Sequence, residues 1–145
     1  MVKFLSGVAL AALAALPAFA DEFILVPSGM SFDDATFAVE SAVVGRGLQV
    51  EYTSHVGDML ERTREDVGSE IVLFEHANIY LFCSATLSRQ AMEANWQNIA
   101  YCPYGVHVIQ RPGEDEVYIG YVHRDAEGMG PVNDFLAALI DEATM

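Results

Sequence analysis

Two strand-like segments on either side of a short turn constrain the fold of this chain more than any other feature. Residues 104–110 and 116–123 are rich in valine, tyrosine and isoleucine, and the turn-forming stretch RPGED lies between them. Such a pattern predicts an antiparallel β-hairpin. The hairpin in turn favours a mainly antiparallel sheet over a doubly wound parallel one.

The predicted hairpin is apolar on both faces. A turn centred after Gly113 places Val108 opposite Ile119 on one face. On the other face it places His107 opposite Gly120, which leaves a gap beside the histidine. A sheet face exposed to water normally carries polar side chains, so the second face requires a cover. The simplest cover is the same face of a second copy, and we therefore predict a homodimer with a two-fold interface.

Helical and strand-like segments alternate along the rest of the chain. The patterns predict strands at residues 22–28, 48–56, 71–75 and 78–83, and helices at residues 32–46, 57–68, 87–94 and 131–143. Because the crossovers are short, we expect an α+β fold of two layers, with a mainly antiparallel sheet and helices packed on one face. No glycine-rich nucleotide-binding motif follows any predicted strand.

Single residues indicate where several of these elements begin and how they lie. Ser31 precedes two aspartates and is typical of a helix N-cap. Pro27 confines the first strand to an edge of the sheet or ends it early, because proline cannot donate a ladder hydrogen bond. Alternation predicts that Leu48, Val50 and Tyr52 share one face of the second strand.

The first twenty residues have the pattern of a secretory signal peptide. Lys3 precedes a short apolar run, and small residues at Ala18 and Ala20 precede the acidic Asp21. The run is too short to span a bilayer as a helix. We therefore expect cleavage after Ala20, export to the periplasm or the medium, and a single domain over residues 21–145.

The charge of the chain limits its partners. The formal net charge is −14, and removal of Lys3 with the signal peptide leaves six arginines and 21 acidic residues, or 6 − 21 = −15. A chain of this charge repels phosphate backbones and anionic lipid. We therefore expect no nucleic acid partner, and no membrane partner once the signal peptide is removed. The sequence does not identify a cofactor or a small-molecule or protein partner.

The two cysteines form the most distinctive pair of reactive side chains. Export would place Cys83 and Cys102 in an oxidising compartment, where an even pair favours one structural disulfide. The alternative is a redox-active or sulfur-handling pair, since Cys83 lies shortly before a predicted helix. Active dithiols usually lie two residues apart, and this pair does not.

A further alternative is a metal or haem site built from cysteine and histidine. The two cysteines and His55, His76, His107 and His123 offer soft ligands. No C-x-x-C-H or H-x-x-x-H motif occurs, so the sequence assigns no metal ligand set.

Signatures of catalysis are also lacking, so we name no catalytic residue. No G-x-S-x-G motif occurs. The pattern therefore favours a binding or accessory module over an enzyme. Ligand-site candidates near the hairpin and cysteines are His55, His107, His123 and Tyr104.

Four stretches give the chain its resemblance to a known family. They are SFDDATFAVESAVVGRGLQVEYTSHV, IYLFCSA, NIAYCPYGVHV and VYIGYVHR, within about residues 30–125. In the order and spacing of these stretches the chain resembles domain-of-unknown-function family 302, in a branch with cysteines at the FCSA and CPY positions. Ser54 stands where the family commonly has an acidic residue before the histidine. The resemblance implies an α+β fold and pairing into dimers, and it implies no established activity.

Overall fold

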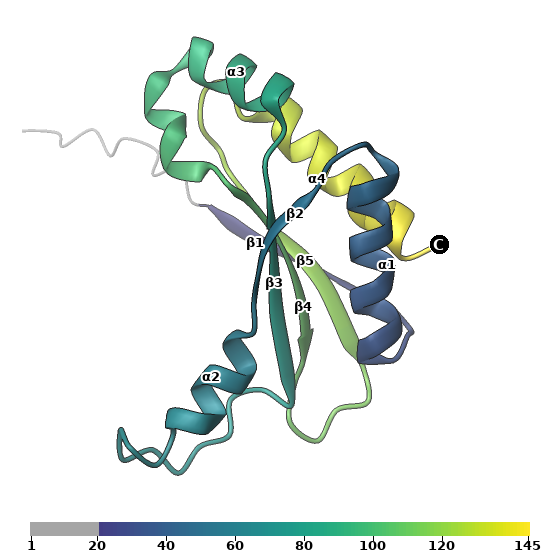
Figure 1. The fold of residues 1–145 in the computed structure, drawn as a ribbon, viewed down its shortest axis with the longest axis vertical. Coiled ribbons are helices and arrows are strands. Elements are labelled where there is room, and N and C mark those ends of the chain that lie inside the picture. The colour runs from purple at the N-terminus through teal and green to yellow at the C-terminus, as the bar shows by residue number, and fades with distance from the viewer. Residues whose placement is uncertain (1–20) are drawn as a thin grey trace, which may run out of the picture.

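A five-stranded sheet forms the centre of the computed structural model, which describes residues 21–145 (Figure 1). The strands are β1 (Glu22–Pro27), β2 (Val50–Ser54), β3 (His76–Phe82), β4 (Tyr104–Gln110) and β5 (Val117–His123). Their order in the sheet is β1-β5-β4-β3-β2, and every neighbouring pair is antiparallel. The predicted α+β class is confirmed. The predicted signal peptide, residues 1–20, lies outside the described residues.

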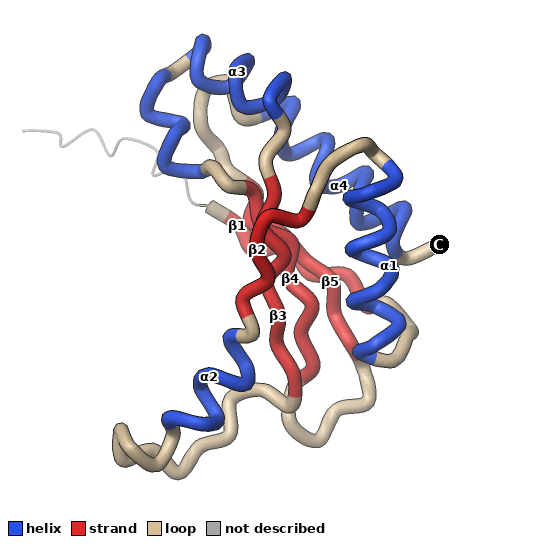
Figure 2. The backbone as a smooth tube through the Cα atoms, viewed as in Figure 1, coloured by secondary structure: helices blue, strands red, loops and turns tan. Residues whose placement is uncertain are grey.

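Helices α1 and α4, whose bounds follow, cover one face of this sheet (Figure 2). The helices are α1 (Phe32–Gly45), α2 (Val56–Thr63), α3 (Ala85–Ala94), α4 (Gly130–Ala143) and the 3-10 helix η1 (Trp96–Tyr101). Within residues 21–145, none of them has the length and apolar character needed to cross a membrane. Helices α1 and α4 pack against each other and against the sheet, where they enclose the hydrophobic core.

Local chemistry explains the two helices that cover the core. Ser31 caps α1, because its hydroxyl oxygen accepts a hydrogen bond of 3.2 Å from the backbone N–H of Asp34. Proline in the first turn of α4 leaves no N–H without a partner at that position. Val132, Leu136 and Leu139 recur at helical spacing and are buried. Both helices agree with the sequence prediction to within a residue or two.

The hairpin has the predicted register over its central part. His107 lies opposite Gly120, and Val108 lies opposite Ile119. The ladder between β4 and β5 ends at Val106. Beyond that point β4 stays paired with β3, and β5 stays paired with β1. The two strands of the hairpin therefore diverge at the end that is farther from the turn.

The strand predicted at residues 71–75 is wrong. The segment has no regular secondary structure, β3 begins only at His76, and no strand of the described residues pairs with residues 71–75. The segment is joined to the sheet by the hydrogen bond of 3.0 Å from Glu75 N–H to the carbonyl oxygen of Gln110. Ile71 is 68% exposed. An apolar run normally indicates burial, and here it lies on the connection from α2 to β3.

The predicted face of Tyr52 is also wrong. Val50 lies opposite Phe82 and Tyr52 lies opposite Leu81, so two residues of β2 match one residue of β3. This β-bulge at Glu51 reverses the alternation of side chains along β2. Tyr52 therefore lies on the face away from the core and is 62% exposed.

Helix α2 departs from the expected arrangement of helices on one face. It contacts β3, and a β-carbon on Gly57 would lie 3.3 Å from the Cβ of Ala77, which shares the non-core face of β3 with Ile79. Figure 1 shows α2 extending from the end of the sheet away from α1 and α4. Helix η1 was not predicted. Asn95 ends α3 as expected, but its side chain then accepts from Gln97 N–H and starts η1.

Candidate functional site

The sheet face opposite α1 and α4, here called the open face, is uncharged at its centre. Direct cross-strand partners share a face, so the register places one set of side chains there. The set includes Phe23, Leu25, Ile79, Leu81, Gly105, His107, Ile109, Tyr118, Gly120 and Val122. Phe23 and Leu25 are each 44% exposed. The prediction of a second apolar face on the hairpin is thus confirmed.

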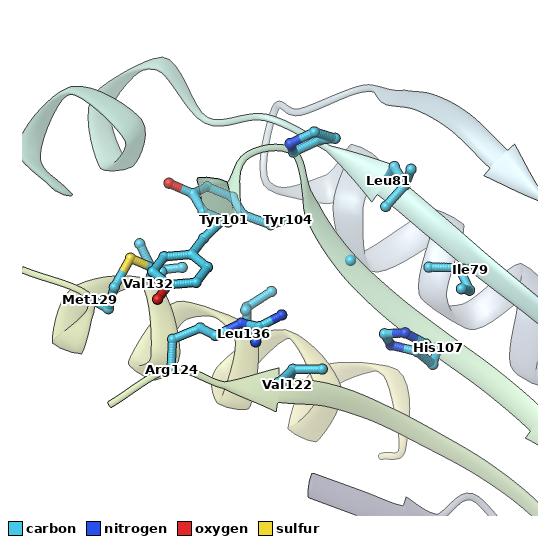
Figure 3. Close-up of a pocket in the computed structure, with 12 residues that line it drawn as sticks. Ile79, Leu81, Tyr101, Tyr104, His107, Val122, Arg124, Met129, Val132 and Leu136 are labelled. Atoms are coloured by element: carbon cyan, nitrogen blue, oxygen red, sulfur yellow. The ribbon is translucent and has the colours of Figure 1, made fainter. Parts of the chain in front are cut away.

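A cavity of about 260 Å³, here called the β4–β5 cleft, opens where the two hairpin strands diverge (Figure 3). Its walls come from β3, β4, β5, η1 and α4. Ile79 and Leu81 form one side, and Met129 and Leu136 lie on the other. Gly105 contributes no side chain, which leaves this part of the cleft unfilled. The cleft therefore leads from the open face towards the core side of α4.

A second cavity of about 290 Å³ adjoins the cleft on the open face. It shares Ile79, His107 and Val122 with the cleft and also contacts Phe23 and Phe74. Its lining is almost wholly apolar. Pockets for small molecules in proteins typically occupy about 300–1,000 Å³. The two adjoining cavities offer space at the lower end of that range.

His107 lies between the two cavities and has an unused nitrogen. Its Nδ1 atom is buried and finds no hydrogen-bond partner among the described residues. Burial lowers the pKa of His107, the positive charge of Arg124 lowers it further, and the backbone of Gly120 opposes both effects. The imidazole is therefore neutral at pH 7 and can both donate and accept a hydrogen bond.

The gap expected beside Gly120 is filled by β1. The Phe23 ring lies edge-on to the His107 ring, with centroids 5.0 Å apart. A β-carbon on Gly120 would clash with the carbonyl oxygen of Ile24 and lie 2.6 Å from Leu25 Cδ2. The sequence did not reveal that β1 pairs with β5, and this pairing moves the available space from Gly120 to the Gly105 side of His107.

Arg124 supplies the positive charge of the cleft. The side chain of the buried Asn133 accepts from Arg124 N–H and donates to its carbonyl oxygen, both at 3.0 Å. These bonds fix the backbone just after β5. The guanidinium lies over the Tyr101 ring, 5.1 Å from its centroid, and forms an ion pair with Asp21. Figure 3 shows Arg124 and His107 facing the same cleft.

The structure brings the two cysteines together. Cys83 follows β3 and Cys102 follows η1, and their sulfur atoms lie 3.2 Å apart as thiols. The hydroxyl of Ser88 lies 3.6 Å from Cys102 Sγ and 3.2 Å from the hydroxyl of Tyr104. Tyr104 is therefore connected to the cysteines through Ser88, on the core side of β4.

The environment of Cys83 suppresses its thiolate form. Burial raises the pKa of Cys83 to about 12, with contributions from Cys102 and Glu51. The thiolate is the nucleophile in thiol–disulfide exchange, so a thiol with so high a pKa reacts slowly at neutral pH.

The other predicted candidates lie apart from the cleft. The exposed His55 precedes α2, and its Nδ1 lies 3.0 Å from Asn78 Oδ1. His123 ends β5 opposite Glu22 and lines neither cavity. His76 packs on Phe32, with ring centroids 4.8 Å apart. Over residues 21–145, no three histidine, cysteine or acidic side chains cluster closely enough to hold a metal ion.

Sequence reasoning missed Arg124, Tyr101 and Ser88. Arg124 carries the one usable signal, because it is an arginine directly after a predicted strand in a chain with few cations. Tyr101 lies in the unpredicted η1, and Ser88 is one of many serines. Their proximity depends on the packing of η1 and α3, which no local pattern reports.

Comparisons with known proteins agree on the fold. The chain is similar to the crystal structure of an uncharacterised conserved DUF302 protein from Bacillus stearothermophilus, with a TM-score of 0.66 and 16% identity over 83% of this chain and 97% of that one. No curated protein matches the chain. Residues 24–143 match the family described as Domain of unknown function DUF302. The chain therefore belongs to the DUF302 family.

Proposed function

We propose that this protein is an exported binding module that holds a small, mostly apolar molecule at the open face of its sheet. The observation that carries the proposal is the buried, unpartnered Nδ1 of His107 between the mostly apolar β4–β5 cleft and the apolar second cavity. A buried polar atom without a partner is costly, and a ligand group that bonds to it removes that cost.

Mostly apolar walls and a few polar groups, His107 among them, define the kind of ligand. Ile79, Leu81 and Val122 provide contact surface without charge. His107 provides one donor or acceptor, depending on which nitrogen carries the proton. This combination is typical of small-molecule sites, where apolar contacts give affinity and a few polar groups fix orientation.

Isothermal titration of the purified protein with 1-octanol tests the proposal. Binding should be saturable and should be lost in Gly105→Val, because the added side chain fills the cleft beside Leu81 and Ile79. Gly45→Val is the matched control, since a β-carbon there meets only Glu142, at 3.8 Å. Equal binding by wild type and Gly105→Val, or no saturable binding to the wild type, would contradict the proposal.

We also propose that Cys83 and Cys102 form a structural disulfide after export. The 3.2 Å distance between the sulfur atoms supports the bridge, because a small movement brings them to bonding distance. The same distance favours a second candidate, a thiol-redox or sulfur-handling function. The high pKa of Cys83 makes this residue a poor attacking nucleophile, so a redox function would have to begin at Cys102.

The third part of the proposal is a homodimer that covers the open face. Two copies with a net charge of −14 or more negative repel each other, and this repulsion is smaller when an uncharged surface forms the contact and keeps the acidic residues apart. The open face is such a surface, and Phe23 and Leu25 remain substantially exposed on it. A two-fold pairing there would enclose the cavities between the two sheets.

A further inference from the structure

One cation, Arg124, lines the β4–β5 cleft, and its backbone is held in place. Both hydrogen bonds between Asn133 and the Arg124 backbone are 3.0 Å long, and Asn133 is buried in α4. The Arg124 side chain is 31% exposed and stacks on the Tyr101 ring. A guanidinium on so fixed a backbone is preorganised to receive an anion.

The present counter-ion of Arg124 comes from outside the cleft. Asp21 forms the ion pair, but it is not among the lining residues and its own side chain is 43% exposed. An exposed ion pair contributes little to stability, so exchanging Asp21 for another carboxylate costs little. Asp21 therefore occupies the position that a ligand carboxylate would take.

The rest of the cleft selects against highly charged ligands. Except for Arg124, its walls are uncharged at neutral pH, since His107 is neutral there. One guanidinium balances one negative charge, while the net charge of the chain repels any second one. The planar guanidinium matches the two oxygens of a carboxylate.

From these observations we propose that the β4–β5 cleft binds an organic monocarboxylate with an apolar tail. Its carboxylate lies on Arg124 and accepts a second hydrogen bond from His107, in the tautomer that carries the proton on Nδ1, and its tail lies along Ile79, Leu81 and Val122. This inference rests on the proposed function, because it names the ligand class of the same site. Arg124 then determines the preference for a carboxylate, and the carboxylate of Asp21 competes with the ligand for Arg124.

Calorimetric titration with octanoate and with 1-octanol, which share a tail, tests the inference. Arg124→Gln should weaken octanoate binding by roughly tenfold or more, because a charge-assisted hydrogen bond is lost. The same variant should weaken 1-octanol binding much less than octanoate binding, because 1-octanol carries no charge to lose a partner. Asp21→Asn should strengthen octanoate binding several-fold by freeing Arg124. Arg111→Gln is the control, because it removes the same charge from the hairpin turn, where Arg111 pairs with Glu114.

The outcomes separate the inference from the function beneath it. If 1-octanol binds and Arg124→Gln leaves octanoate affinity unchanged, the carboxylate inference is overturned and the binding module stands. The inference is also overturned if Arg111→Gln weakens octanoate binding as much as Arg124→Gln does, because the effect is then one of net charge. If neither probe binds the wild type, both proposals fall. Asp21→Asn keeps the test decisive should Arg124→Gln not fold, since unchanged octanoate affinity in Asp21→Asn also overturns the inference.

Discussion

His107 carries a buried polar atom whose cost depends on pH. Because burial lowers its pKa below the ordinary value of about 6.5, the unfolded chain binds a proton at His107 more readily than the folded one. Stability contributed by the neutral form is therefore present above about pH 6.5, and it falls as the pH drops towards the lowered pKa of the folded state.

We predict that His107→Gln reduces this loss of stability in acid. Urea unfolding at pH 7.5 and pH 5 measures it for both proteins, and the difference between the two pH values should be smaller in His107→Gln. The comparison between proteins removes the shared contribution of the acidic residues. An equal loss in both would show that His107 does not titrate as its burial requires.

The cysteine pair gives a second prediction at this scale. A bridge between Cys83 and Cys102 closes a loop of about 20 residues and should contribute roughly 3 kcal/mol. Cys83→Ser should therefore lower the melting temperature of the oxidised protein, and neither wild-type sulfur should react with iodoacetamide before denaturation and reduction. Rapid reduction of the folded protein by a mild thiol, with unchanged stability in Cys83→Ser, would instead favour the redox function.

The sequence identified some residues of the candidate site and missed others. It singled out Cys83, Cys102 and His107 because their side-chain chemistry is distinctive wherever it occurs. It missed Arg124, whose role depends on Asn133 and Tyr101. Both partners come from helices that pack only in the folded domain. Residue type is visible in the sequence, but the surroundings of a residue are not.

Among the elements, β1 is the one whose packing is most sensitive to a small change. It lies so close to β5 that a β-carbon on Gly120 would clash with the Ile24 carbonyl oxygen. Gly105 lies on the same open face, where a β-carbon would come 3.3 Å from the flexible end of Leu81. The free-energy cost of adding a β-carbon therefore depends on what lies beside each glycine in the sheet.

We therefore predict that Gly120→Ala destabilises the fold by about 1–3 kcal/mol through overpacking. Gly105→Ala, its matched control, should cost clearly less, because a side-chain end can move where a backbone carbonyl cannot. Chemical denaturation measures both. Equal costs would mean that β1 does not lie against Gly120.

Some features of the helices and strands could be predicted from the local sequence pattern alone, and others could not. The hairpin register followed from turn position and alternation, and the N-cap of α1 followed from Ser31. The strand expected at residues 71–75 failed because strand formation needs a partner. The face of Tyr52 failed because a bulge at Glu51 reverses the alternation. Pairing and bulges are set by tertiary structure, which periodicity does not encode.

For the whole molecule, the question is what covers the open face. The α+β class was predictable, since alternating helices and strands around an antiparallel hairpin leave few arrangements. The position of α2 was not predictable. Helix α2 packs on β3 beside Ala77 and leaves Phe23 and Leu25 exposed. The apolar second face of the hairpin nevertheless indicated, from the sequence alone, that this face of the sheet requires a cover.

We predict that the protein is a dimer in solution and that Leu25→Glu makes it a monomer. The substitution places a charge on the edge strand β1, within the proposed uncharged interface and at a side chain that is 44% exposed. Val44→Glu, on an exposed position of α1, is the control and should remain dimeric. Light scattering coupled to size-exclusion chromatography at micromolar concentration measures the mass. A monomeric wild type, or equal effects of both variants, would contradict the interface.

The central claim is that the open face around His107 is a binding site. Titration of ¹⁵N-labelled protein with 1-octanol, followed by amide chemical shifts, tests it most directly. The account predicts saturable shifts concentrated at Ile79, His107 and Val122, which line both cavities. Shifts confined to exposed apolar residues elsewhere, such as Trp96 and Ile99 of η1, or no saturable shifts at all, would contradict it.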